Sequence, residues 1–274
     1  HAAQDAIELP GSRVTLQGRF GYGVPVVVPL RNEAVDVSLD DCSGWQPVAG
    51  GTTDSLGNVA MALNAPVSYV GRTNMRYVVA GDATVAEARL YTLPRGTHVV
   101  VVDIDGTLTT DDGEYIRQLM LHSLGRDYDP KAFPDAVSLT RAWVQKGYIV
   151  LYLTSRPMGT ADITRAWLSD HGFAAGPLHM TEGPGEFMPN DKGAGAYKLA
   201  FLKGLQERGY VLDYAYGNAD TDVFAYKGAN ISIKHMFTIG KKAGMEGTQP
   251  LPPGYTSHLK WVAAQPNAAQ PFLY

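Results

Sequence analysis

The chain has 274 residues, which is enough for one large domain or two ordinary ones with a substantial core. Its net charge of -4 and its pI near 6.0 lack the basic surplus of a general nucleic-acid binder, so we expect no nucleic-acid partner. No apolar run approaches the roughly 18–20 residues of a membrane span. The single cysteine, Cys42, excludes an intramolecular disulfide and a cysteine-based zinc cluster, and we expect it to be a small buried hydrophobe or a loop thiol.

The chain starts at His1-Ala-Ala-Gln and not at a methionine. This start fits either the product of a cleaved export signal or a remnant of cloning. The first alternative gives an exported, periplasmic bacterial protein, and the second leaves a soluble or membrane-peripheral one. Both stay open at the level of the sequence.

Residues 1–95 are predicted to form a small all-β domain, an Ig-like sandwich. Short runs of alternating polarity recur there at nearly regular spacing, with Gly- and Asp-rich turns between them, which is typical of such folds. No group of His, Asp or Glu in this part has catalytic spacing, so we expect a structural or docking module. The hinge into the second domain, 96–274, is predicted at Leu93–Gly96. The runs of alternating polarity, which are the predicted strands of this first domain, are 13–17, 24–30, 35–39, 59–63, 75–79 and 86–91.

Residues 97–240 alternate between apolar strands and amphipathic helices, which predicts an α/β fold with a parallel sheet and crossover helices. The tail from Pro250 to Tyr274 has one apolar cluster, at 259–262, and is expected to pack onto a domain. The predicted strands are 98–102, 148–153, 177–181 and a short one at 214–217. The predicted helices are 114–124, 134–146, 159–171 and 196–208, and 182–195 is expected to be a loop.

The most informative stretch follows the first of these strands. Four consecutive valines predict a strand that is buried on both faces, and the run stops at Asp103. In open α/β sheets, ligands bind at this carboxyl end of the strands. Asp105 follows two residues later and is expected to point to the same side. Gly106 then permits a sharp turn that the Thr107 hydroxyl can fasten.

Two carboxylates this close repel each other unless a cation lies near them. The pair therefore suits a nucleophile, Asp103, beside an acid/base, Asp105, with Mg2+ compensating the charge. The alternative is a pair of aspartates that only caps a turn. The resemblance described below favours the catalytic interpretation.

Three more segments carry polar residues that suit a phosphate site. Thr154, Ser155 and Arg156 follow the strand 148–153, at the same sheet edge as Asp103. Lys198 lies in the first turn of a helix, where the dipole disfavours a cation, so we expect it to pair with the aspartates and hold a phosphoryl group. Asn218 and Asp222 span a strand-to-helix turn and offer the oxygen donors that Mg2+ prefers.

The order of these pieces resembles the motifs of the haloacid dehalogenase (HAD) phosphotransferases. Leu151 to Arg165 and Tyr216 to Tyr226 are similar to the lipin-like (LNS2-type) branch, which includes Mg2+-dependent phosphatidate phosphatase and retinal-degeneration-type lipid-transfer proteins. The resemblance implies a HAD-like Rossmannoid sheet. It assigns the following roles: catalysis by Asp103, Asp105, Thr154 and Lys198; substrate contact by Gly106, Thr107, Ser155 and Arg156; and Mg2+ binding by Asp103, Asp105, Asn218 and Asp222.

The leading expectation is therefore a phosphoric monoester hydrolase that converts phosphatidate to diacylglycerol through an aspartyl-phosphate, with peripheral membrane contact. One alternative is a non-catalytic phosphatidate-binding or lipid-transfer module. Another is a HAD phosphatase for a soluble sugar or inositol phosphate. The expected ligand in every case is a phosphorylated small molecule or a lipid head group.

Overall fold

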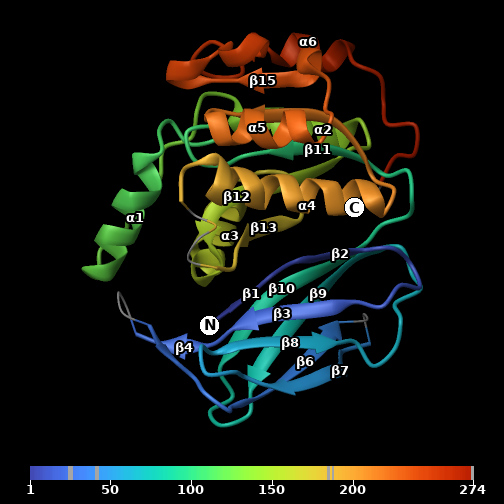
Figure 1. The fold of residues 1–274 in the computed structure, drawn as a ribbon, viewed down its shortest axis with the longest axis vertical. Coiled ribbons are helices and arrows are strands. Elements are labelled where there is room, and N and C mark those ends of the chain that lie inside the picture. The colour runs from blue at the N-terminus through green and yellow to red at the C-terminus, as the bar shows by residue number, and fades with distance from the viewer. Residues whose placement is uncertain (24–26, 41–42, 184–185, 187, 273–274) are drawn as a thin grey trace. The chain divides into compact units, whose positions relative to one another are not determined.

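The computed structural model describes the chain except for residues 24–26, 41–42, 184–185, 187 and 273–274. The chain divides into two compact units, 1–94 with 158–164, and 95–157 with 165–273 (Figure 1). No helix in the described part of the chain is long and apolar enough to cross a bilayer.

The first unit is built from β-strands, as the sequence predicts. One sheet has the order β1-β3-β8, a second has the order β2-β10-β9-β6-β7, and β4 pairs with β5. Neighbouring strands are antiparallel except for β2 and β10. The strands are β1 (Ala2–Ala3), β2 (Ala6–Glu8), β3 (Thr15–Arg19), β4 (Gly21–Tyr22), β5 (Val28–Pro29), β6 (Ala34–Asp40), β7 (Trp45–Thr52), β8 (Asn58–Ala62), β9 (Gly71–Val79) and β10 (Val85–Thr92).

Alternating side chains of these strands form the core of this sandwich-like unit, around Phe20, Met75 and Tyr77. The sequence analysis missed β7, because Gly50-Gly51 was assigned to a turn, and the strand also contains Pro47. The structure places them in a strand at the edge of its sheet, where a missing N–H is tolerated. The expectations for Cys42 and for part of the run 24–30 fall outside the described residues.

The second unit contains the predicted parallel sheet, with six strands in the order β13-β12-β11-β14-β15-β16. Figure 1 shows α4 and α5 in front of this sheet and α2 behind it. The strands are β11 (His98–Val102), β12 (Ile149–Pro157), β13 (Leu178–Thr181), β14 (Val211–Gly217), β15 (Met236–Thr238) and β16 (Gln249–Pro250). The helices are α1 (Gly113–Ser123), α2 (Ala136–Gln145), α3 (Ala161–Asp170), α4 (Ala196–Glu207), α5 (Asp220–Gly228) and α6 (Leu259–Ala264).

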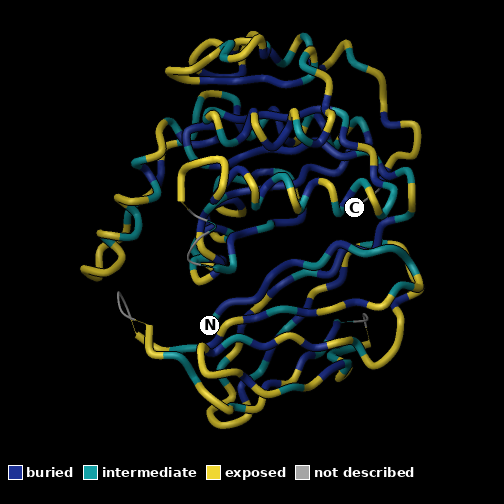
Figure 2. The backbone as a smooth tube through the Cα atoms, in the orientation of Figure 1, coloured by how far each residue is buried: buried dark blue, intermediate teal, exposed yellow. Residues whose placement is uncertain are grey.

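Burial follows the expected pattern of a sheet that is covered on both faces. Val99 to Val102 of β11 are all buried, and the central strands appear as continuous dark segments in Figure 2. Because β11 lies between β12 and β14 and is parallel to both, its carboxyl end lies beside the carboxyl ends of these two strands. This topology brings segments that are far apart in sequence to one edge of the sheet.

Two local predictions were wrong. The strand predicted to end before Thr154 continues to Pro157, with an irregularity in its pairing to β13 after Leu153. The predicted loop 182–195 ends in a π-helical turn, η2 (Asp191–Gly195), which leads directly into α4. The Asn190 side chain accepts hydrogen bonds from the N–H groups of Lys192 and Gly193 and so fixes the start of that turn. Short 3-10 turns lie at Met158–Thr160, Ile233–His235, Gly240–Lys242 and Met245–Gly247.

The C-terminal tail packs onto the sheet unit through an aromatic and polar network. Trp143 Nε1 donates to the Tyr216 hydroxyl (3.0 Å), which lies 2.9 Å from His258 Nε2. Burial lowers the pKa of His258 to about 4, so the ring is neutral. Its Nε2 atom can therefore accept a hydrogen bond from the Tyr216 hydroxyl. Trp261 of α6 stacks on His258. The tail is therefore fixed by a satisfied buried hydrogen-bond chain as well as by apolar contact.

We predict that Tyr216→Phe lowers the free energy of unfolding by roughly 1–3 kcal/mol, because it leaves the Trp143 N–H and His258 without their shared partner. Urea denaturation followed by tryptophan fluorescence measures this loss. Tyr22→Phe is the control: this tyrosine of β4 is 45% exposed, so the loss should be smaller. Equal losses in the two variants would contradict the role given to the network.

Candidate functional site

The site is built at the carboxyl end of β11. Asp103 follows the last residue of that strand, and its N–H donates to the Tyr216 carbonyl of β14 (3.0 Å). Its side chain is buried. The valine run therefore places a carboxylate at the edge of the sheet with its backbone held by the neighbouring strand, as the sequence analysis expects.

Gly106 makes the turn after Asp103 possible. Its φ of +69° lies in the left-handed region, which favours glycine. A Cβ atom at this position would meet the Asn218 Nδ2 atom at 2.0 Å and the Asp112 Oδ1 atom at 2.5 Å. Glycine is thus required by the backbone angle and by the close approach of Asn218.

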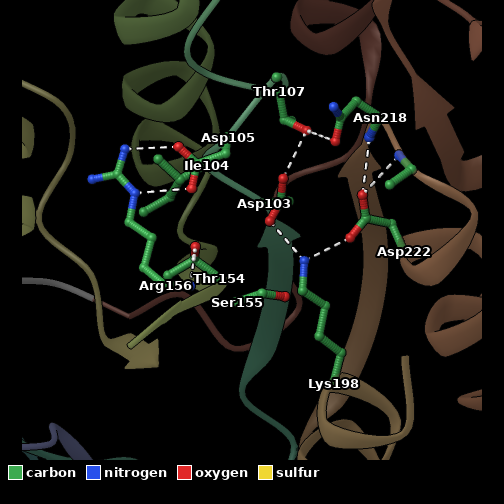
Figure 3. Close-up of polar contacts among 12 residues, drawn as sticks. Asp103, Ile104, Asp105, Thr107, Thr154, Ser155, Arg156, Lys198, Asn218 and Asp222 are labelled. Atoms are coloured by element: carbon green, nitrogen blue, oxygen red, sulfur yellow. Dashed lines mark hydrogen bonds and ion pairs between the residues drawn. The ribbon is translucent and has the colours of Figure 1, made fainter. Parts of the chain in front are cut away.

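The centre of the site is the buried ammonium of Lys198, which is 2% exposed. Its Nζ atom lies 2.6 Å from Asp103 Oδ1 and 2.6 Å from Asp222 Oδ1 (Figure 3). On the other side of Asp103, the Thr107 hydroxyl lies 3.1 Å from Oδ2. Both oxygens of Asp103 are therefore occupied by donors from its own chain.

The electrostatics of this trio depend on burial and on opposite charges. Burial raises the pKa of Asp103 to about 7, with Lys198 opposing the rise and the neighbouring aspartates adding to it. Burial by itself would lower the pKa of Lys198, but the charges of Asp103 and Asp222 outweigh it and raise the pKa. The lysine is thus held in its charged form between the two carboxyl groups.

Asn218 and Asp222 lie where the sequence predicts, across the turn between β14 and α5. Asp222 Oδ2 accepts the N–H groups of Asn218 (3.0 Å) and Ala219 (3.1 Å), which fixes the turn. Asn218 Oδ1 lies 3.4 Å from the Thr107 hydroxyl, and its Nδ2 donates to Asp112 Oδ1 (2.8 Å). Asp222 therefore connects the lysine to the backbone of this turn.

Asp105 belongs to a different network from Asp103. The Arg156 guanidinium donates from Nε to Asp105 Oδ2 (2.9 Å) and from Nη2 to Oδ1 (2.8 Å), which is a bidentate pair. Figure 3 shows the two carboxylates directed towards opposite partners, Asp105 towards Arg156 and Asp103 towards Lys198. The expectation that both project to the same side was wrong, because the chain turns after Asp103 and does not stay extended.

Thr154 and Ser155 complete the edge on the β12 side. Thr154 is fully buried, and its hydroxyl oxygen accepts the Arg156 N–H (3.2 Å), which leaves the hydroxyl proton for a further acceptor. Ser155 is half-buried, and its carbonyl accepts from the Thr181 hydroxyl (3.3 Å). Their roles towards a phosphate stay predictions.

Three residues that the sequence analysis did not select contribute to the site. Asp112 bonds Asn218, the Tyr115 ring lies 4.5 Å from the Arg156 guanidinium carbon, and the Tyr255 hydroxyl donates to the Thr107 carbonyl (2.7 Å). From the sequence, Asp112 is predicted to be part of a turn, and Tyr115 is predicted to be an ordinary residue of the helix 114–124. Tyr255 comes from the tail, 148 residues away from its partner, so no local pattern indicates it.

The oxygen atoms around Asp103 determine whether the site can hold the expected Mg2+. Within the described residues, no three His, Cys, Asp or Glu side chains are grouped to hold a metal by themselves. Asp103 Oδ2 and Asn218 Oδ1 both lie within reach of the Thr107 hydroxyl, however, and are hard oxygen donors. Mg2+ commonly takes one or two such ligands and keeps several waters. The chemistry of the donors fits Mg2+, with water supplying the remaining ligands.

Comparison with known protein families gives matches over both units. A model described as "PITM 1-3, LNS2 domain" matches residues 100–240, and one described as "PITM 1-3, beta-sandwich domain" matches residues 1–92. Among solved structures, the extracellular domain of the voltage-gated sodium channel beta4 subunit covers 33% of this chain and 85% of that chain, at 11% identity. Its TM-score of 0.25 is too low to carry an argument about the fold.

The curated relatives include membrane-associated phosphatidylinositol transfer proteins. Membrane-associated phosphatidylinositol transfer protein 3 of Homo sapiens is 31% identical over 271 residues, which cover 96% of this chain and 26% of that protein. Protein retinal degeneration B of Drosophila melanogaster is 30% identical over 271 residues, with 96% of this chain and 20% of that protein covered. The chain thus spans about a quarter or less of the relatives' length.

These relatives overturn the expectation of a phosphoric monoester hydrolase. The human relative is named for phosphatidylinositol transfer and not for hydrolysis, and the lipid-binding alternative fits this name better. The aspartate pair is therefore no evidence of phosphatase activity in this chain.

We predict that Lys198→Met lowers the free energy of unfolding by about 3–5 kcal/mol, because it leaves two buried carboxyl groups without their counter-ion. Chemical denaturation at neutral pH measures the loss. A second substitution, Asp103→Asn, should recover part of it by removing one of the uncompensated groups.

Lys242→Met is the control, since this exposed lysine pairs with Asp220 at the surface. Its effect should stay within about 0.5 kcal/mol. Lys198→Met with the stability of the wild type would show that the buried ion pairs do not support the fold.

Proposed function

The chain belongs to the family of PITM 1-3 LNS2 domains, and we propose that it binds the phosphate head group of an anionic membrane lipid without hydrolysing it. Phosphatidate is the first candidate for this lipid. The name of the human relative, a membrane-associated phosphatidylinositol transfer protein, supports the lipid and membrane part of the proposal. We further propose a HAD-like fold for the second unit, from the order of Asp103, Thr154, Lys198 and Asn218 along the chain.

One observation carries the proposal: two buried cations and several hydroxyl groups lie at a single edge of a parallel sheet. The cations are Lys198 and Arg156, and the hydroxyls belong to Thr107, Thr154 and Ser155. Charged hydrogen bonds from such groups are the strong contacts that hold a phosphate. A phosphomonoester head group, with more negative charge than a diester, suits a pair of cations. This favours phosphatidate over phosphatidylinositol.

The same edge also carries carboxylates, which repel an anion. Asp103, Asp105 and Asp222 oppose the two cations, so phosphate binding needs additional positive charge or proton uptake. We propose Mg2+ as that charge, held by oxygens of Asp103 and Asn218 together with water. When bound, Mg2+ would neutralise the phosphate and the carboxylates together.

Vesicle flotation tests the proposed function. We expect the chain to float with phosphatidylcholine vesicles that contain phosphatidate, and to float less with vesicles that contain phosphatidylinositol or phosphatidylcholine alone. EDTA should weaken the binding and Mg2+ should restore it. Ser155→Ala should weaken it about tenfold, the effect of losing one hydrogen bond to a charged group.

Ser169→Ala is the matched control, because this serine is exposed on α3, outside the site. It should bind as the wild type does. Equal flotation with phosphatidate-containing and pure phosphatidylcholine vesicles would contradict head-group recognition. Stronger flotation with phosphatidylinositol than with phosphatidate would contradict phosphatidate as the ligand and indicate phosphatidylinositol instead.

A further inference from the structure

Helix α1 exposes a stripe of large apolar side chains to solvent, while its half-buried side mixes Gln118 with Leu119 and Leu121. Ile116, Met120 and Leu124 recur at every fourth residue, so they share one face of the helix and its C-terminal cap. They are 63%, 56% and 66% exposed. A helix at the surface of a globular protein normally has the opposite arrangement, with the apolar stripe on the core.

The inner face of α1 is anchored by a buried carboxylate. Of the eleven residues of α1, all of them described, Glu114 alone is buried. Glu114 accepts hydrogen bonds from Arg117 Nη1 (2.8 Å), the Tyr128 hydroxyl (2.7 Å) and the Lys131 N–H (2.9 Å). The helix is therefore held by polar contacts at its first turn, and Figure 1 shows the rest extending away from the sheet of its unit.

The start of α1 is continuous with the candidate site. Tyr115 in its first turn lies against the guanidinium of Arg156, which holds Asp105. Asp112, the residue before the helix, accepts from Asn218. The apolar stripe therefore begins within one turn of the residues that form the site.

We propose that α1 inserts into an anionic lipid bilayer and so presents the site to the phosphates of that bilayer. Ile116, Met120 and Leu124 would enter the acyl boundary, as the apolar face of an interfacial helix does. Arg126 follows the end of the helix and is exposed. A basic side chain in this position complements the lipid phosphates at the depth of the head groups.

This proposal rests on the proposed function, because it assumes that the ligand is a lipid in a membrane. A groove of another protein, or a second copy of the chain, would also cover an apolar stripe. The continuity with a phosphate site favours the membrane. It explains why an uncharged stripe lies beside a cluster of charged groups.

The first test compares vesicle binding of the wild type with that of the triple variant Ile116→Gln/Met120→Gln/Leu124→Gln. Glutamine has about the helix propensity of leucine, so α1 should stay folded, and circular dichroism checks this. Partitioning into phosphatidate-containing vesicles should fall at least about tenfold, because three apolar side chains no longer leave water. Binding of a short-chain, water-soluble phosphatidate should be unchanged, since the site is intact.

The matched control is Val85→Ser/Val211→Ser, which removes two exposed apolar side chains from strands β10 and β14. It should bind vesicles as the wild type does. A second measurement places the fluorophore NBD at Met120→Cys or at His122→Cys in a Cys42→Ser background, since Cys42 is the native cysteine. When vesicles are added, the emission maximum of the label at 120 should shift to the blue, and the emission of the label at 122 should change less.

The outcomes separate the two proposals. If the wild type binds neither the vesicles nor short-chain phosphatidate, the proposed function fails and this inference fails with it. If the wild type binds phosphatidate but the triple glutamine variant partitions equally, or the label at 120 stays in water, the inference alone is overturned. A wild-type oligomer that the triple variant dissociates would show that the stripe is a subunit interface, which also overturns the inference.

Discussion

The site depends on one interaction, the buried ammonium of Lys198 between the carboxyl groups of Asp103 and Asp222. It joins the carboxyl end of β11 to the first turns of α4 and α5. A buried charge without a partner is costly, so each of the three positions constrains the other two. The arrangement of the remaining donors follows from it, including Thr107 on Asp103 and the turn at Asn218 that Asp222 holds.

Much of this arrangement could be predicted from residue patterns. The run of valines that stops at Asp103 predicts a buried strand with a carboxylate at its end, and the structure has that strand at the centre of a parallel sheet. Lys198 was singled out because a cation is disfavoured at the start of a helix, and its ammonium reaches the aspartates. Asn218 and Asp222 follow from a strand that runs into a polar turn. In each case the prediction came from a polar or charged residue at the end of a strand or at the start of a helix.

The rest could not be predicted, because it depends on which partner each side chain finds in space. Asp105 and Arg156 are 51 residues apart, and nothing local indicates that the guanidinium would take both carboxylate oxygens. The same residue types suit a hydrolase and a binding module, so the activity inferred from the motif was wrong although the structure brings Asp103, Lys198 and Asp222 together. Function lies in the geometry of a site more than in its residue types or its fold. The exposed apolar stripe of α1 could not be predicted either, because it is recognised only once the burial of each side chain is known.

The central claim is that the site holds a lipid phosphate and leaves it intact. Phosphorus-31 NMR of a short-chain phosphatidate, titrated with the chain in the presence of Mg2+, tests this most directly. The account predicts that the phosphomonoester resonance shifts to a saturating value and that no inorganic phosphate signal grows over hours. A growing inorganic phosphate signal that Asp103→Asn abolishes, or a resonance that never shifts, would contradict it.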